Sequence, residues 1–224
     1  NGAGCIRPDS VPVERRKLVR RCGAGVVIVR GDGDMGKCIA ECIATAERMA
    51  AEDPRVYVPQ QFENEDNLFA HKYHTALEIV EDVEGPIHGF CSGIGTGGTI
   101  SGVGQILKRL YPDVEIWAVE PENAAILSGG GIGTHLQMGI GDGLIPAILD
   151  QEIYDDIYII SDEEALDTAR ALARKEGLLC GVSSGTNVAA ARRLARKLGA
   201  GKTVVTLLPD TGGRYFATEL CDGE

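Results

Sequence analysis

The chain has 224 residues, 44% of them hydrophobic, which is enough for one substantial core or a core with a smaller lobe. Acidic residues outnumber basic ones 33 to 22, and the formal charge of -11 argues against a nucleic-acid partner. No apolar run is long enough to span a bilayer and no signal segment opens the sequence, so we expect no membrane role and a cytoplasmic protein.

Short apolar runs alternate with stretches of helical period, the pattern of an α/β protein whose helices cover a parallel sheet. Strands are predicted around Cys5 and Ile6 and over residues 26–29, 87–92, 116–119 and 203–208. Apolar side chains at helical spacing predict helix faces at Ile39, Ile43, Ala46 and Ala50, at Phe69, Tyr73, Leu77 and Val80, and at Ile100, Val103, Leu107 and Leu110.

Helix ends are signalled most clearly in the second half of the chain. Ser161 followed by Glu164 resembles a capping box, and Gly177 is a suitable terminator for the helix that follows. A last helix is predicted over residues 186–198, closed by Gly199. Residues 128–143 are rich in glycine and lack periodicity, so we expect an irregular loop of the kind that serves a site.

Seven cysteines are scattered through apolar segments without paired CxxC spacing, and we predict that they are reduced core thiols. Cys38 and Cys42 lie at the spacing of one helix face. Two thiols with no nearby histidine pair make a poor metal site, so no metal is expected.

The glycine-rich turn at residues 93–99 joins a predicted strand to a predicted helix. Unpaired N–H groups and the helix dipole favour an anion at such a junction, and a phosphate fits there. The hydroxyls of Thr96 and Thr99 add donors in a loop that has no lysine or arginine.

Two other interpretations of this turn stay open at this point. Gly93, Gly95 and Gly98 also satisfy GxGxxG, and Glu120 ends the next strand, as an NAD-type dinucleotide-binding domain requires. In the other interpretation, the glycines serve packing alone.

Several motifs occur in order along most of the chain, and together they carry a family resemblance. They are Pro8-Asp9-Ser10, residues 14–18, residues 59–64, Gly95 to Thr99, residues 118–121, residues 139–141, residues 181–185 and Arg214-Tyr215. This series resembles the cysteine synthase (O-acetylserine sulfhydrylase) and cystathionine β-synthase family of pyridoxal-phosphate (PLP) enzymes. The resemblance implies fold type II, like the tryptophan synthase β subunit, with residues 1–64 in an incomplete smaller lobe and 65–224 in the larger lobe.

The resemblance also assigns roles to individual residues. The phosphate of PLP is expected at Gly95, Thr96, Gly97, Gly98 and Thr99. The family's serine that bonds the pyridine nitrogen matches Ser183, although Ser183 or Ser184 is equally suited to cap a helix. Gln61 matches a glutamine that holds the substrate carboxylate, and Gly139 belongs to a stretch lining the substrate entrance, which continues here into Asp142 and Leu144.

The family's reaction further needs a lysine that forms a Schiff base with PLP and a carboxylate-binding Ser/Thr-Gly-Asn-Thr-Gly loop. Neither is found in this sequence, which opens at Asn1, and Lys37 at a predicted helix start is no substitute. We therefore expect a truncated chain that is inactive by itself.

For the complete protein, the resemblance implies a homodimer that converts O-acetylserine and sulfide to cysteine and acetate, with serine acetyltransferase as a partner. The alternatives are cystathionine β-synthase activity on serine and homocysteine, and a non-catalytic binding protein.

Overall fold

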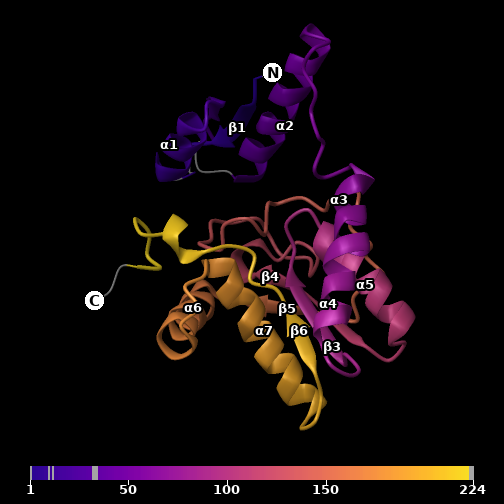
Figure 1. Ribbon diagram of the computed structural model, residues 1–224. Coiled ribbons are helices and arrows are strands. Elements are labelled where there is room, and N and C mark those ends of the chain that lie inside the picture. Colours follow the sequence, from indigo (N-terminus) through magenta and orange to yellow (C-terminus); the bar gives the residue numbers. More distant parts are fainter. Residues whose placement is uncertain (1, 10, 12, 32–34, 222–224) are drawn as a thin grey trace. The chain divides into compact units, whose positions relative to one another are not determined.

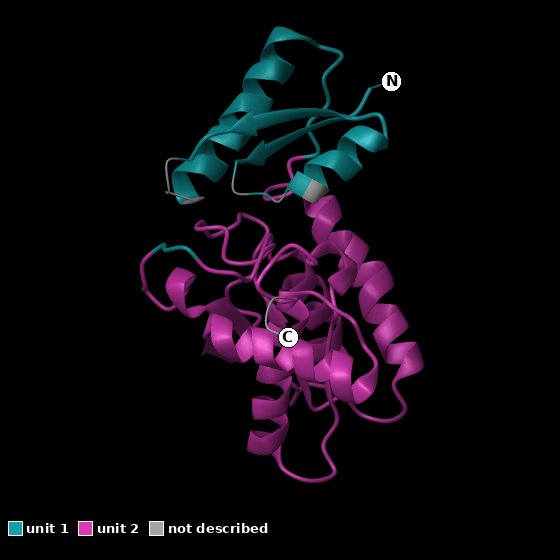
Figure 2. Cartoon of the chain, turned by 90° about the vertical axis from the view of Figure 1, so that its left-hand side faces the viewer, with its two compact units in different colours: residues 1–59, 132–134 teal, residues 60–131, 135–224 magenta. Residues whose placement is uncertain are grey.

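The computed structural model describes residues 2–9, 11, 13–31 and 35–221 (Figure 1). The chain divides into two compact units, residues 1–59 with 132–134, and residues 60–131 with 135–224 (Figure 2). The lobe boundary predicted from the sequence lies at residue 64, within the second unit. Among the described residues, no helix combines the length and apolar character needed to cross a membrane.

The first unit is built on two parallel strands, as the sequence predicts for its opening residues. Strand β1 (Gly4–Pro8) pairs with β2 (Gly25–Val29), and α1 (Val13–Arg21) connects them. Helix α2 (Met35–Glu52) follows, with Lys37 exposed near its start. Ser10, one of the residues that carry the family resemblance, lies outside the described residues.

The second unit holds a four-stranded, entirely parallel sheet in the order β5-β4-β3-β6, which confirms the α/β prediction. Its strands are β3 (Gly89–Gly93), β4 (Glu115–Pro121), β5 (Asp156–Ile160) and β6 (Val204–Thr206). Its helices are α3 (Glu65–Ala70), the π-helix η1 (His71–Thr75), α4 (Ala76–Asp82), α5 (Gly98–Leu110), η2 (Glu122–Ala124), α6 (Asp162–Glu176), α7 (Val182–Leu198) and η3 (Gly212–Arg214).

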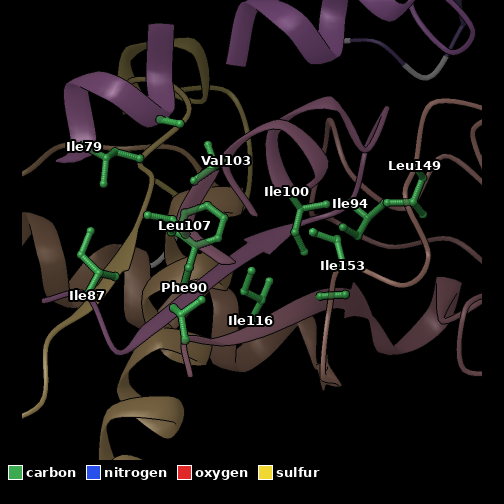
Figure 3. Packing of buried hydrophobic residues seen from close by; sticks show 13 residues of the cluster. Ile79, Ile87, Phe90, Ile94, Ile100, Val103, Leu107, Ile116, Leu149 and Ile153 are labelled. Carbon is green, nitrogen blue, oxygen red and sulfur yellow. The ribbon is translucent and has the colours of Figure 1, made fainter. Parts of the chain in front are cut away.

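Buried side chains fill the space between the sheet and α5 (Figure 3). Phe90 of β3 and Ile116 of β4 meet Val103 and Leu107 of α5, and all four side chains are fully buried. Each contributes roughly 1.5–3 kcal/mol by leaving water. This packing fixes α5, and with it the loop that enters α5, against the sheet.

The final helix begins earlier than the sequence predicts. Helix α7 starts at Val182, with Gly181 as its N-cap and no side-chain cap, so Ser183 and Ser184 lie inside the helix and neither caps it. Gly185 is helical because α6 passes against it, where a Cβ would lie 2.0 Å from the carbonyl oxygen of Ala165. Tertiary packing overrides the local preference of glycine for a helix end.

The stripe predicted on the helix after residue 65 is also wrong. Phe69, Tyr73 and Leu77 are exposed, and Ala76 and Ile79 are buried in their place. The π-helical segment η1 interrupts the α-helical period between α3 and α4, so a stripe counted at constant spacing does not follow the buried face.

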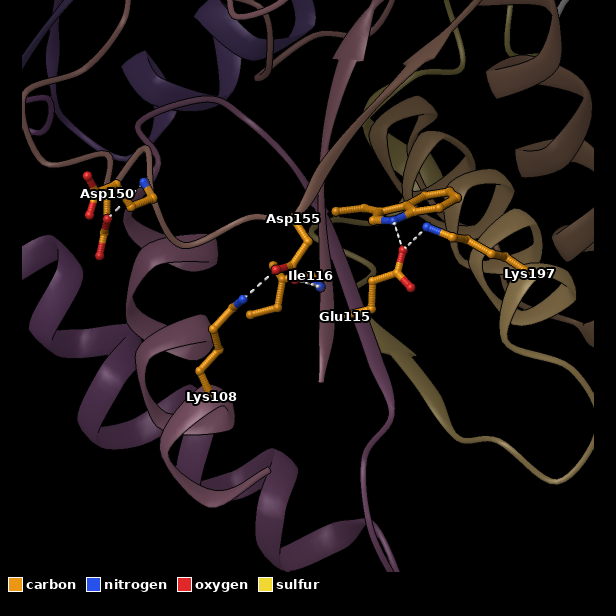
Figure 4. A network of polar contacts seen from close by, with 8 residues as sticks. Lys108, Glu115, Ile116, Asp150, Asp155 and Lys197 are labelled. Carbon is orange, nitrogen blue, oxygen red and sulfur yellow. Dashed lines mark hydrogen bonds and ion pairs between the residues drawn. The ribbon is translucent and has the colours of Figure 1, made fainter. Parts of the chain in front are cut away.

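Acidic and basic side chains form a network at the amino ends of the parallel strands (Figure 4). Glu115 at the start of β4 accepts a hydrogen bond from the indole of Trp117 at 2.6 Å and pairs with Lys197. Asp155, just before β5, pairs with Lys108 of α5 at 2.6 Å. Partly exposed pairs of this kind are worth about 1 kcal/mol or less, and they stabilise the sheet edge opposite the candidate site.

All seven cysteines are free, as predicted, but the prediction that they are core residues is only partly right. Cys22 and Cys221 are exposed and Cys5 is half-buried. The buried thiols are Cys38, Cys42, Cys91 and Cys180. Burial raises the pKa of Cys91 to about 12 and that of Cys42 to about 11, so these thiols are protonated and unreactive.

The serine cap of α6 supplies a first prediction, while the Glu164 carboxylate accepts from the Tyr158 hydroxyl. The Ser161 hydroxyl accepts from the Glu164 N–H at 3.2 Å, and Gly177 closes the helix at φ +70°. Ser161→Ala should lower the free energy of unfolding by about 1 kcal/mol, because the N–H loses its acceptor. Urea unfolding followed by fluorescence of Trp117, the single tryptophan, measures this. Ser161→Asp keeps an acceptor and should stay close to the parent; equal losses in both variants would contradict the cap.

Candidate functional site

The candidate site lies where the parallel strands end. Strands β3, β4 and β5 run in the same direction, so the loops that leave their carboxyl ends meet at one edge of the sheet. Gly95 to Thr99 leave β3 and enter α5 at this edge, as predicted. The long irregular loop that follows β4 occupies the same edge, with Gly141 N–H donating to the carbonyl oxygen of Ile94 at 2.9 Å.

Three glycines of the loop have no room for a side chain. A Cβ on Gly95 would lie 2.5 Å from the carbonyl oxygen of Gly139, and one on Gly98 would lie 2.4 Å from Oδ1 of Asn67. Gly97 adopts φ +81°, and a Cβ there would lie 2.8 Å from the Cβ of Leu149. These positions therefore require glycine for conformation and for close packing.

Backbone donors collect where this loop becomes α5. The bond from Ser101 N–H to the Gly97 carbonyl closes the first turn at 3.1 Å, so the N–H groups of Gly98, Thr99 and Ile100 precede the intrahelical ladder. Gly97, the N-cap residue, supplies no side-chain acceptor, and the Gly98 N–H makes a long contact of 3.4 Å with the Thr96 hydroxyl. Helical N–H groups and the helix dipole favour an anion, and a glycine loop allows it close approach, so the residues present fit a phosphate group.

A second layer of polar side chains, which the sequence analysis missed, supports the loop. Asn67 of α3 donates to the Thr96 hydroxyl at 2.9 Å, and the His71 ring lies 3.2 Å from the Thr99 hydroxyl. The two residues are four apart, the spacing that places side chains on one helix face. That spacing is the only sequence signal that points to them.

Both side chains reach the loop because their helix lies against α5 at Gly102. A Cβ there would lie 2.6 Å from the carbonyl oxygen of Leu68 and 2.8 Å from the N atom of Lys72. The helix that carries Asn67 and His71 therefore contacts α5 backbone to backbone.

Gln61 lies in a tight turn that is tied to the glycine loop Gly95–Thr99. Gln60 has φ +52°, the one positive value among the non-glycine residues that the structure describes, and its carbonyl accepts from Glu63 N–H and Asn64 N–H. Such a conformation costs about 1–3 kcal/mol and persists where the surroundings enforce it. The Gln61 side chain is exposed, and its carbonyl oxygen accepts from Asn67 Nδ2 at 2.8 Å.

Ser183 is buried, with 5% of its surface exposed, in the first turn of α7. One turn later, Asn187 accepts from Gly93 N–H at 2.7 Å and donates to the Leu207 carbonyl at 2.9 Å. Asn187, a second residue that the sequence analysis missed, thus holds α7 to the ends of β3 and β6. This tie brings Ser183 to the sheet edge that carries the loop.

Gly139 lies against the glycine loop Gly95–Thr99 through its carbonyl oxygen, and it adopts φ +95°. Asp142 lies in the same loop, and its Oδ2 atom is 3.9 Å from the point where a Cβ of Gly95 would lie. Burial raises the pKa of this carboxyl above its ordinary range, against a smaller opposing effect of the nearby His135 ring. The structure thus places a weakly acidic group beside the loop.

The carboxylate of Glu120 is engaged by the loop that follows β4. Glu120 is 3% exposed, and its carboxylate accepts from Leu127 N–H at 2.8 Å and from the N–H and hydroxyl of Ser128 at 3.1 and 2.9 Å. A dinucleotide fold needs this carboxylate for ribose hydroxyls. Because Glu120 is committed to its own loop, the dinucleotide interpretation loses its acidic residue.

The raised pKa of Asp142 gives a prediction about stability. Because the pKa of Asp142 is higher in the folded protein than in the unfolded chain, protonation of this carboxyl stabilises the fold. That contribution to the free energy of unfolding is fully present below the usual pKa of 3.8 and is lost as the pH rises through the folded-state pKa. Asp142→Asn removes the cost of ionisation and should be more stable than the parent at pH 7, with a gap that narrows toward pH 4. Urea unfolding at several pH values measures the gap, with the exposed Asp113→Asn as control. A gap independent of pH would contradict the assignment.

Comparison with known proteins places this geometry in a family. The family model described as "Pyridoxal-phosphate dependent enzyme" matches residues 4–210. A cysteine synthase of Staphylococcus aureus is 42% identical over 214 residues, which cover 95% of this chain and 67% of that protein. The chain thus corresponds to 67% of the length of this relative.

Solved structures give the same result. The crystal structure of a cysteine synthase (OASS) of Entamoeba histolytica matches with a TM-score of 0.90 and 36% identity, over 100% of this chain and 65% of that chain. An O-acetylserine dependent cystathionine β-synthase of Helicobacter pylori matches with a TM-score of 0.88 and 35% identity, over 97% of this chain and 69% of that chain. The chain therefore belongs to the pyridoxal-phosphate dependent enzymes, and its fold is that of their fold type II members.

Proposed function

We propose that the protein to which this chain belongs is a cysteine synthase, which replaces the acetate of O-acetylserine with sulfide to give cysteine. Family membership implies PLP as the cofactor. One observation supports the site assignment most directly: a glycine loop without room for side chains delivers backbone N–H groups and two hydroxyls at the start of α5. The similarity to proteins named cysteine synthase supports the reaction.

In this proposal each candidate residue has a separate task. Gly95 to Thr99 bind the phosphate, and Ser183 faces the pyridine nitrogen. Gln61 and Gly139 contact the substrate. PLP supplies an electron sink for the amino acid that is bound to it. A serine hydroxyl is neutral and stabilises a protonated pyridine less than a carboxylate does, which favours elimination at the β carbon over transamination.

Cystathionine β-synthase activity is the second candidate, because the similar protein from Helicobacter pylori is described as an O-acetylserine dependent cystathionine β-synthase. Turnover of the full-length protein with O-acetylserine and sulfide should exceed turnover with serine and homocysteine by tenfold or more, on the order of the discrimination that a few pocket contacts supply. Product formation followed by mass spectrometry compares the two pairs. A preference for serine and homocysteine would replace the proposal by the second candidate.

We also propose that residues 1–224 alone do not catalyse the reaction, because the lysine that the resemblance requires has no match among them. Borohydride fixes PLP to a lysine covalently. Treatment of the full-length protein should add one phosphopyridoxyl group, whereas the 23.8 kDa chain should gain none. Intact mass measures both. An adduct on the 224-residue chain would contradict this proposal, and absence of an adduct on the full-length protein would favour a non-catalytic binding protein.

The remaining expectations concern the setting of the enzyme. We propose that it is a cytoplasmic homodimer that also binds serine acetyltransferase, and that the first 64 residues contribute to its smaller lobe. The family resemblance supports these proposals. Sedimentation of the full-length protein, with and without the acetyltransferase, tests both associations.

A further inference from the structure

The orientation of the Asn67 side-chain amide is fixed by its surroundings. One of its contacts is the carbonyl oxygen of Gln61, which can only accept, so the atom 2.8 Å away is the donating Nδ2. The same nitrogen lies 2.9 Å from the hydroxyl of Thr96. Each of its two hydrogens therefore has an acceptor, and Asn67 donates to Thr96.

This donation decides what the Thr96 hydroxyl can do. A hydroxyl has two lone pairs and one hydrogen. The oxygen of Thr96 accepts from Asn67 and, at 3.4 Å, from the N–H of Gly98. With both lone pairs engaged, the hydroxyl hydrogen remains for a further acceptor. An ionised phosphate oxygen is such an acceptor.

The same arrangement recurs at Thr99. The Nε2 atom of His71 lies 3.2 Å from the Thr99 hydroxyl, and its Nδ1 lies 3.1 Å from the hydroxyl of Thr75. Burial lowers the pKa of His71, so the ring is neutral and carries one N–H. If Thr99 donates to a phosphate, it accepts from Nε2–H, and Nδ1 accepts from Thr75. One set of proton positions therefore satisfies the whole series of hydrogen bonds from Thr75 through His71 to Thr99.

We propose that Asn67 and His71 are positioning residues that fix the direction of the hydrogen bonds made by the two threonine hydroxyls of the glycine loop Gly95–Thr99. Each donates to a threonine hydroxyl, Asn67 to Thr96 and His71 to Thr99, and so reserves the hydroxyl hydrogen for the cofactor phosphate. Asn67 also ties the Gln61 backbone to the same loop, so the phosphate and carboxylate sites share one support. The inference rests on the proposed function, because it requires that the anion at this loop is the phosphate of PLP.

Affinity for PLP relative to pyridoxal measures the phosphate contribution, because both carry the aldehyde and only PLP carries the phosphate. Dissociation constants are determined by equilibrium dialysis against full-length apoprotein. Asn67→Leu keeps the side-chain shape, removes the donor and should reduce the preference for PLP roughly fivefold. In a Thr96→Val background the same change should alter the preference by less than about twofold, because the hydroxyl on which it acts is gone.

The same helix offers a matched control. Asn64 caps α3 by accepting from Asp66 N–H, and its capping bond does not involve the loop. Asn64→Ala should lower the unfolding temperature and leave the preference for PLP unchanged. His71→Phe, with and without Thr99→Val, tests the second hydroxyl in the same way, and it keeps the proposal testable when Asn67→Leu does not fold.

The outcomes separate the two proposals. A parent protein with no preference for PLP over pyridoxal would overturn the cofactor assignment of the loop and the positioning role with it. A parent with a strong preference that Asn67→Leu and His71→Phe leave intact would overturn the positioning role alone. Equal losses in the threonine and valine backgrounds would also overturn it, because the side chains would then act by another route.

Discussion

The close contact between two helices at Gly102 is the constraint on which the candidate site depends. Any side chain at this position would displace the backbone of Leu68 or Lys72. With glycine there, the helix that begins at Glu65 comes near enough for Asn67 and His71 to reach the loop at the start of α5. The π-helical segment η1 lies in the same contact, and such segments are frequent at functional sites.

The parts of the fold that follow local rules were predictable from the sequence. Strands β1 to β4 and β6, helix α5 and the two ends of α6 agree with prediction, because apolar period, a capping serine and a terminal glycine are short-range signals. Strand β5 was not predicted. The start of α7 and the buried face of the helix after residue 65 were not predictable in this way. Gly185 and the π-helical segment acquire their conformations from packing against neighbouring helices.

The residues of the candidate site also differ in how far the sequence could predict them. The loop Gly95 to Thr99 could be recognised because its glycines form a contiguous motif. Asn67, His71 and Asn187 could not, because isolated polar residues on helices usually face solvent. Their hydrogen bonds to Thr96, Thr99 and Gly93 join residues 28 to 94 positions apart in the chain. Apart from the four-residue spacing of Asn67 and His71, the sequence gives no sign of these contacts until the helices are placed.

The tie made by Asn187 has a consequence for the order in which the protein matures on the ribosome. Asn187 holds Gly93 only where α7 is docked, and the nitrogen of the same side-chain amide donates to the carbonyl oxygen of Leu207, just beyond β6. Strand β6 pairs with β3, which is synthesised more than a hundred residues earlier. The nascent chain therefore makes the glycine loop long before it can be locked. Asn187 can therefore join Gly93 to Leu207 only after β6 has left the exit tunnel, so the hydrogen bonds that support this edge of the sheet form late in synthesis.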